Sequence, residues 1–174
     1  MIDRGIIVVS RCMLAAISFL LCIGATPTAS SGEQNNSEHS RPSNRRVVLD
    51  PKLYWYYAAM GKLEHLKTSE GQVEGSYSER GVRTEFTIKT SDLKNPVART
   101  KGYKLAVEKI IAYMAPGAVP DNEANRKYMA ELTKNLEAIT GMHFTGHDDW
   151  KKWFDANHEK LQWSEAQNTL IVQE

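Results

Sequence analysis

The segment YKLAVEKIIAYM, residues 103–114, carries the strongest periodic pattern in this sequence. Its apolar side chains recur three and four positions apart, at Tyr103, Ala106, Val107, Ile110, Ile111 and Met114. This spacing places them on one face of an α-helix, because a helical turn contains about 3.6 residues. Asn95-Pro96 before the pattern and Pro116-Gly117 after it are typical start and stop signals. The segment therefore predicts an amphipathic helix with one buried face.

Three further segments predict helices around this one. Asp50-Pro51 is a start signal, and apolar residues at helical spacing continue that helix to about Lys67. Pro120-Asp121 opens another helix, which Gly141 ends. A last helix begins at His147 to Asp149 and carries Trp150, Trp153, Phe154 and Leu161.

The period of the pattern changes to two between Gln72 and Lys89. Val82, Thr84, Phe86 and Ile88 alternate with charged or polar residues, and a turn-like Ser78–Gly81 precedes them. We expect a β-hairpin near residues 72–89, with the β-prone tail Thr169–Val172 paired to it. The fold class predicted for residues 47–174 is therefore a single, mainly α domain of about four helices with a small β-hairpin.

The N-terminal residues have the pattern of an export signal. Arg4 and Arg11 accompany a short apolar run, which small residues follow as far as Ser31. We expect residues 1–31 to be a cleaved signal peptide and the protein to be exported, either periplasmic or secreted. Residues 32–46 contain no large apolar side chain, so they predict a disordered linker.

Composition limits the partners and the chemistry. The chain has 174 residues, with 22 Lys and Arg against 21 Asp and Glu, and this balance argues against a nucleic-acid partner bound by charge. No stretch after the signal is apolar enough to span a bilayer. Both cysteines, Cys12 and Cys22, lie in the leader, so we expect the mature domain to depend on its apolar core, without disulfides.

Two local patterns resemble exported bacterial proteins with HEAT-like helical repeats. Asp92 to Arg99, with its Asn-Pro pair, resembles the turn between two helices of a repeat. Residues 139–154 resemble an ending in which Thr-Gly-x-x-Phe precedes Trp-x-x-Trp; the matching residues are Thr140, Gly141, Phe144, Trp150 and Trp153. The resemblance covers Asp92 to His158 and implies a structural role for these five residues. It also implies a module that binds or scaffolds macromolecules.

Consecutive aromatic residues Tyr54, Trp55, Tyr56 and Tyr57 predict a binding surface. On a helix they spread over more than half of the circumference, so one core cannot bury all of them. Exposed Trp and Tyr are common interface anchors, although packing of this helix on the hairpin would also explain them. We take Trp55, Tyr54, Tyr57 and Trp163, which follows the last helix, as candidate contacts.

The sequence offers few residues that are spaced for catalysis or metal binding. His143 and His147 are four residues apart, but the glycines around them predict a loop, where this spacing does not align them as metal ligands. The sequence has no nucleophile elbow and no phosphate-binding glycine loop. These observations predict neither catalytic residues nor a cofactor.

The resulting hypothesis is an exported, non-enzymatic interaction or scaffolding domain with a protein partner. The alternative is a small extracytoplasmic carbohydrate-binding protein or hydrolase that uses the Tyr54–Tyr57 cluster as a stacking platform. A third possibility is that the edge of strand Val82–Ile88 recruits another chain by strand addition, which its charged residues could equally prevent.

Overall fold

A four-stranded mixed sheet opens the part of the chain that the computed structural model describes, residues 46–174. Strands β2 (Leu63–Ser69), β3 (Gln72–Glu79) and β4 (Val82–Lys89) form an antiparallel meander, and β1 (Val47–Val48) pairs with β4 in parallel. The order across the sheet is β1-β4-β3-β2. Arg80 and Gly81 join β3 to β4 with φ angles of 50° and 77°, as a tight turn between twisted strands requires.

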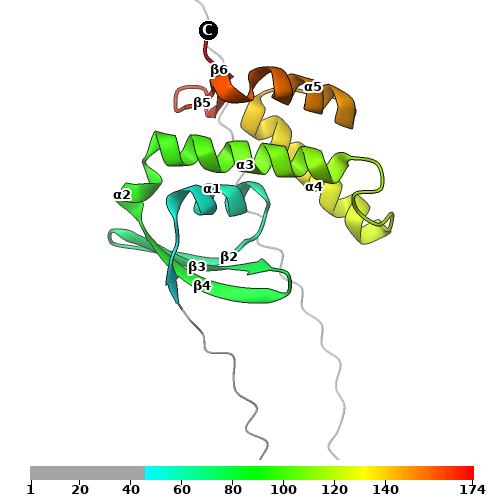
Figure 1. Cartoon of the computed structure of the whole chain (residues 1–174). Helices are drawn as coiled ribbons and strands as arrows, with labels where there is room; N and C mark the ends of the chain where they lie inside the picture. Colours follow the sequence, from blue (N-terminus) through cyan, green and yellow to red (C-terminus); the bar gives the residue numbers. More distant parts are fainter. Residues whose placement is uncertain (1–45) are drawn as a thin grey trace, which may run out of the picture. The chain divides into compact units, whose positions relative to one another are not determined.

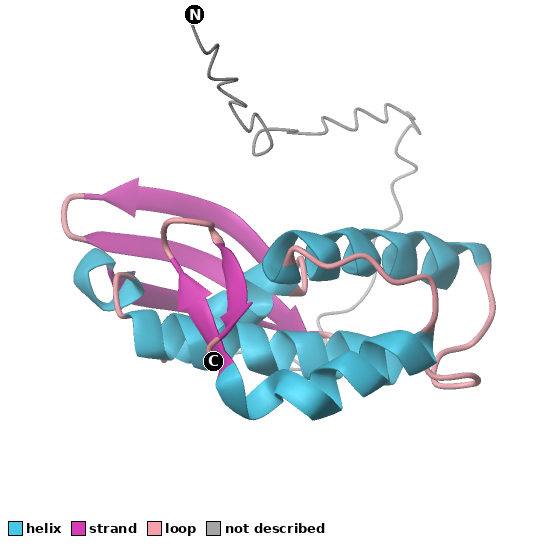
Figure 2. Cartoon of the chain, turned by 90° about the horizontal axis from the view of Figure 1, so that it is seen from above, coloured by secondary structure: helices cyan, strands magenta, loops and turns pink. Residues whose placement is uncertain are grey.

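Five helices and a second sheet complete this part of the chain. The helices are α1 (Pro51–Ala59), α2 (Thr90–Leu93), α3 (Pro96–Met114), α4 (Glu123–Thr140) and α5 (His147–Asn157). A single 3₁₀ turn (His158–Lys160) leads from α5 into an antiparallel pair, β5 (Leu161–Ser164) and β6 (Thr169–Val172). This pair lies on the far side of α3 from the four-stranded sheet (Figure 1), and Figure 2 shows it as a separate ribbon next to the C-terminus.

Helix α1 lies between the four-stranded sheet and α3 (Figure 1). On the sheet side, Tyr57 joins a core with Leu49, Val73, Phe86 and Ile88. On the other side, Ala59 and Met60 belong to a second core, built from α3, α4, α5 and the β5–β6 pair. The aromatic run is therefore accommodated by two cores on opposite sides of one short helix, and none of its four residues is exposed.

The predicted fold class, mainly α with a small hairpin, is wrong. About a quarter of the described residues are in strands, and the expected hairpin (β3 and β4) is half of a four-stranded mixed sheet. The first helix ends at Ala59 instead of near Lys67. Gly61 adopts a φ of 64°, and the N–H groups of Gly61 and Lys62 donate to the carbonyls of Ala58 and Tyr57, which caps the helix and releases β2.

The expected pairing of the C-terminal tail with the hairpin is also wrong. The tail Thr169–Val172 pairs with Leu161–Ser164, because the turn at residues 165–168 reverses the chain directly after β5. Strand β1 pairs with β4 at Phe86 and Thr87, so this part of the Val82–Ile88 edge is already occupied within the chain. The strands at the two edges of the larger sheet are β1 and β2.

Helix α3 confirms the helix that the strongest periodic pattern predicts. The Asn95 side chain accepts hydrogen bonds from the backbone N–H groups of Val97 and Ala98 at 3.0 and 3.2 Å, so it caps the helix as the Asn-Pro pair predicts. Helix α4 begins slightly later than expected, because Asn122 acts as its N-cap in place of Asp121. Helix α5 begins at His147 after Gly146, and Asp148 and Asp149 lie in its first turn.

The expected signal peptide and all but the last residue of the expected linker lie outside the described residues. Within residues 46–174, no helix is both long and apolar enough to cross a bilayer.

Gly102 sets the distance between α1 and α3. A Cβ atom at this position would lie 2.7 Å from Cβ of Trp55 and would also clash with the carbonyl oxygen of Lys52. A backbone atom cannot rotate away as a side chain does, so a larger residue would have to push the two helices apart.

We therefore expect Gly102→Ala to lower the free energy of unfolding by about 2 kcal/mol, because overpacking outweighs the gain in helix propensity of about 1 kcal/mol. Urea denaturation would measure the change. Gly146→Ser is the matched control: nothing lies within 4 Å of its Cβ, and Ser is a good N-cap, so no loss of stability is expected there. Equal stability of the Gly102→Ala variant and the wild type would contradict the close approach.

Tyr57 connects α1 to the sheet by a polar contact as well as by packing. Its hydroxyl donates to Oε2 of Glu79 at 2.9 Å, and its ring stacks on Tyr77 with centroids 4.2 Å apart. Burial, followed by the hydrogen bond to Glu79, raises the pKa of Tyr57 well above its usual value. Burial also raises the pKa of Tyr54, Tyr56, Tyr103 and Tyr128.

These raised pKa values predict that stability falls above about pH 10. Unfolded tyrosines ionise near that pH while the folded ones stay protonated, so the unfolded state is stabilised relative to the folded state as the pH rises. The loss is at most about 1.4 kcal/mol per pH unit for each such tyrosine. Urea denaturation across this range would measure the slope, and Tyr57→Phe should make it shallower. A slope unchanged by this substitution would contradict the assignment to Tyr57.

Candidate functional site

A surface groove of about 750 Å³ runs along the side of α3 that faces away from the cores. Residues of α3 from Pro96 to Glu108 form one wall. The other wall comes from the end of α5, the turn after it and the start of β5, and Lys52 of α1 contributes at one end. The groove therefore lies where three segments distant in sequence meet.

Helix α3 supplies this wall because it is apolar on more than one side. Its buried face packs in the core that Ala106, Val107 and Ile110 share with α4 and α5. The groove face carries Val97 and Leu105, with 59% and 41% of their surface exposed. Phe154, half-buried, lines the opposite wall. The groove thus offers apolar side chains to solvent in a hollow, where a partner could bury them.

Charged groups surround these apolar side chains. Lys101 and Lys104 line the groove on α3, and they form no ion pair with any residue of the described part of the chain. Lys52 lies 3.5 Å from the carboxylate of Asp50. Asp155 is paired with Lys151 at 2.5 Å, and Glu108 lies further along α3.

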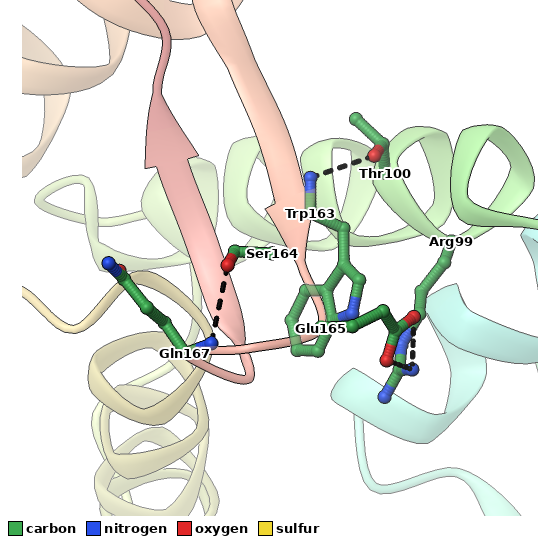
Figure 3. A network of polar contacts seen from close by, with 6 residues as sticks. All are labelled: Arg99, Thr100, Trp163, Ser164, Glu165 and Gln167. Carbon is green, nitrogen blue, oxygen red and sulfur yellow. Dashed lines mark hydrogen bonds and ion pairs between the residues drawn. The ribbon is translucent and has the colours of Figure 1, made fainter.

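An arginine stacked between two tryptophans lies next to the groove; Figure 3 shows it beside one of them, Trp163. The guanidinium carbon of Arg99 lies 4.0 Å from the ring centroid of Trp55 and 4.1 Å from that of Trp163, with Tyr103 at 5.8 Å. Both carboxylate oxygens of Glu165 accept hydrogen bonds from Nη1 of Arg99 at 3.0 Å. Each stacked ring stabilises the cation through its π-face.

This cluster holds one wall of the groove in place. Trp55 comes from α1, Arg99 from α3, and Trp163 and Glu165 from β5 and the turn after it. The backbone N–H of Trp163 also donates to Oγ1 of Thr100 at 2.9 Å, and that of Gln167 donates to Oγ of Ser164 at 3.2 Å (Figure 3). The position of β5 beside α3 is therefore set by stacking and by directed hydrogen bonds.

The structure places the four predicted contact residues mainly inside the protein. Tyr57 is buried against the sheet, and Tyr54 lies half-buried with its ring edge-on to Trp55 at 5.3 Å. Trp55 is covered by Arg99 and Tyr103. Trp163 lines the groove although only 8% of its surface is exposed. The structure thus brings Trp55 and Trp163 together around Arg99 and keeps Tyr54 and Tyr57 on the sheet side.

The five residues matched to the Thr-Gly-x-x-Phe and Trp-x-x-Trp pattern fall into two groups, one at the end of α4 and one aromatic cluster. Gly141 ends α4 with a φ of 66°, and the Thr140 hydroxyl donates to the carbonyl of Leu136 at 2.8 Å. Phe144 packs edge-on against the fully buried Trp150, with centroids 4.9 Å apart, and Trp153 lies 5.9 Å from Trp150. The aromatic contacts pack Phe144, in the loop after α4, against α5.

His143 and His147 have different partners. Nδ1 of His143 lies 2.5 Å from a Glu137 carboxylate oxygen, and Nδ1 of His147 lies 2.8 Å from that of Asp148. Within residues 46–174, no group of three or more His, Cys, Asp or Glu side chains is arranged to hold a metal ion.

Most of the groove is not predicted by the sequence patterns. The Asn-Pro pattern places Arg99 in an inter-helix turn, and Val97, Lys101, Lys104 and Leu105 have no predicted role. Leu105 does carry a signal, because it falls outside the buried stripe of α3 and stands beside a lysine on the polar side. No sequence pattern predicts that Arg99 contacts Trp55 and Trp163, since these two residues are far apart in the chain.

Comparison of the chain with models of known protein families, with curated proteins and with solved structures finds no match.

We expect Arg99→Ala to lower the free energy of unfolding by about 2 kcal/mol, because two stacked rings and a buried wall of the groove lose their common partner. Glu165→Gln keeps the stacked guanidinium and removes only a charge on a residue whose side chain is 62% exposed, so it should cost under about 1 kcal/mol. Chemical denaturation of both variants tests this order. Equal losses in the two would show that the ion pair, and not the stacking, stabilises the cluster.

Proposed function

We propose that the protein is an exported, non-enzymatic interaction domain that binds a protein partner through the groove on α3. The observation that carries the proposal is the pair of exposed apolar side chains, Val97 and Leu105, on a helix face that lines a hollow of about 750 Å³. Exposed apolar side chains in a concave surface are typical of sites that another molecule covers.

Two further features support this proposal. The groove wall is made from α3 and β5, which the Arg99 cluster holds together, so a partner would meet a preorganised surface. Preorganisation lowers the entropic cost of binding. Export rests on the basic and apolar pattern of residues 1–31, and the resemblance of Asp92–His158 to HEAT-like proteins points to the same class of binding module.

The aromatic cluster supports the carbohydrate-binding alternative less well. Its rings are engaged with one another, with Tyr77 and Phe86 of the sheet, or with Arg99, and none of the four lines the groove. A sugar would need a free ring face to stack on, and Trp55 already has a guanidinium on its ring.

A photo-crosslinking amino acid in place of Leu105 should capture the partner in the organism that makes the protein, because this side chain would lie inside the interface. The same amino acid in place of Val82, which is 65% exposed at the turn of the β3–β4 hairpin, is the matched control. Mass spectrometry of the adducts reads the result. Adducts of equal yield at both positions, or at neither, would contradict a binding surface on α3.

Leu105→Glu should weaken co-purification of the captured partner by about tenfold, since a charge would replace an apolar contact. The substitution should change the free energy of unfolding by less than about 0.5 kcal/mol because the side chain is exposed in the free protein. Val82→Glu serves again as the control for the same chemical change.

A further inference from the structure

We propose that the occupant of the groove on α3 is an acidic segment of a protein partner, in which a carboxylate lies two residues away from an apolar side chain. This inference rests on the proposed function and adds the chemistry of the partner to it. The inference starts from Lys101 and Lys104, two groove lysines that have no ion pair among the described residues.

At the end of the groove away from Glu108, the side chains without an ion-pair partner among the described residues are positively charged. Asp155, a potential partner for cations, is already held by Lys151 from outside the groove, and Lys52 is balanced by Asp50. Lys101 and Lys104 have no such partner among the described residues, and Glu108 lies one turn further along α3 than Lys104. A carboxylate of the occupant would therefore gain most near Lys101.

The dipole of α3 favours a negative charge at the same end of the groove. The helix begins at Pro96, so the positive end of its dipole lies in the first turn beside Val97, one turn before Lys101. Glu108 stands nearer the C-terminal end of the groove. An acidic group is thus favoured at the start of α3 and disfavoured at the Glu108 end, which sets the end of the groove where the carboxylate of a bound segment lies.

The apolar contacts fix the second feature of the occupant. Leu105 lies one helical turn beyond Lys101, a rise of about 6 Å, and half-buried Phe154 is on the opposite wall. In an extended segment two residues span about 6.6 Å. A carboxylate near Lys101 therefore places a side chain two residues away near Leu105 and Phe154, and this gives the pattern acid-x-apolar or, for a segment that runs the other way, apolar-x-acid.

For the test, all 174 residues are expressed, and the protein is purified in the form that accumulates. The probe is the fluorescent peptide acetyl-GDSLSDSLSDG-amide, in which each Leu has an Asp two residues before it and another two residues after it, and anisotropy measures its binding. Two comparison peptides replace either every Asp by Lys or every Leu by Ser. We expect binding of the first peptide alone; absence of that binding, or equal binding of the lysine peptide, would overturn the proposal.

Charge reversal in the groove identifies the lysines. Lys101→Glu combined with Lys104→Glu should weaken binding by about tenfold or more, since an attraction becomes a repulsion. The control is Lys67→Glu combined with Lys127→Glu, which changes the net charge equally on exposed lysines that do not line the groove. Raising the salt from about 0.1 M to about 1 M shortens the Debye length from about 10 Å to about 3 Å and should weaken binding as well. Equal effects of the two double variants would overturn the assignment.

A membrane surface is the competing occupant that two unpaired lysines could also attract. Sedimentation with vesicles of phosphatidylglycerol and phosphatidylethanolamine tests it, and binding to vesicles without binding to the peptide would overturn the acidic segment. If crosslinks form at Leu105 but charge reversal at Lys101 and Lys104 leaves them unchanged, the interaction domain stands and the acidic occupant fails. If no crosslink forms at Leu105 while the peptide binds as expected, the acidic site stands and the proposed function fails.

Discussion

The contact between α1 and α3 at Gly102 is the constraint on which the rest of the structure depends. Because this residue has no side chain, the backbone of α1 at Lys52 approaches α3 closely enough for Trp55 to rest against it. Helix α1 has only nine residues, and so short a helix is not stable in isolation. Its two-sided burial, against the sheet and against α3, therefore connects the two cores of the protein.

The same close approach explains the surface around the groove. With α1 held against α3, Trp55 meets Arg99, and Trp163 covers the other side of the guanidinium. That arrangement leaves Val97 and Leu105 exposed on the outward side of α3. Dense packing on one side of a helix and exposed apolar groups on the other are thus two results of one geometry.

Sequence patterns predict the helices and strands that are determined by residues close together in the chain. The Asn95-Pro96 cap and the stripe from Tyr103 to Met114 were sufficient for α3, and alternation was sufficient for β3 and β4. Strand β2 was missed because Leu63 continued a helical spacing, whereas Gly61 ended the helix two residues earlier. The aromatic run predicts that one core cannot bury all four rings, but a pattern on one helix does not reveal that packing layers exist on both of its sides.

By itself, the sequence determined where the strongest helices begin and end, which of their faces are apolar, and that residues 1–31 resemble an export signal, because these properties depend on neighbouring residues. Only the tertiary structure decided that four strands form one sheet, that Arg99 lies between Trp55 and Trp163, and that Lys101, Leu105 and Phe154 share a groove. These arrangements join residues tens of positions apart, and the free energy that selects them comes from burial and stacking between segments, which a local pattern does not contain.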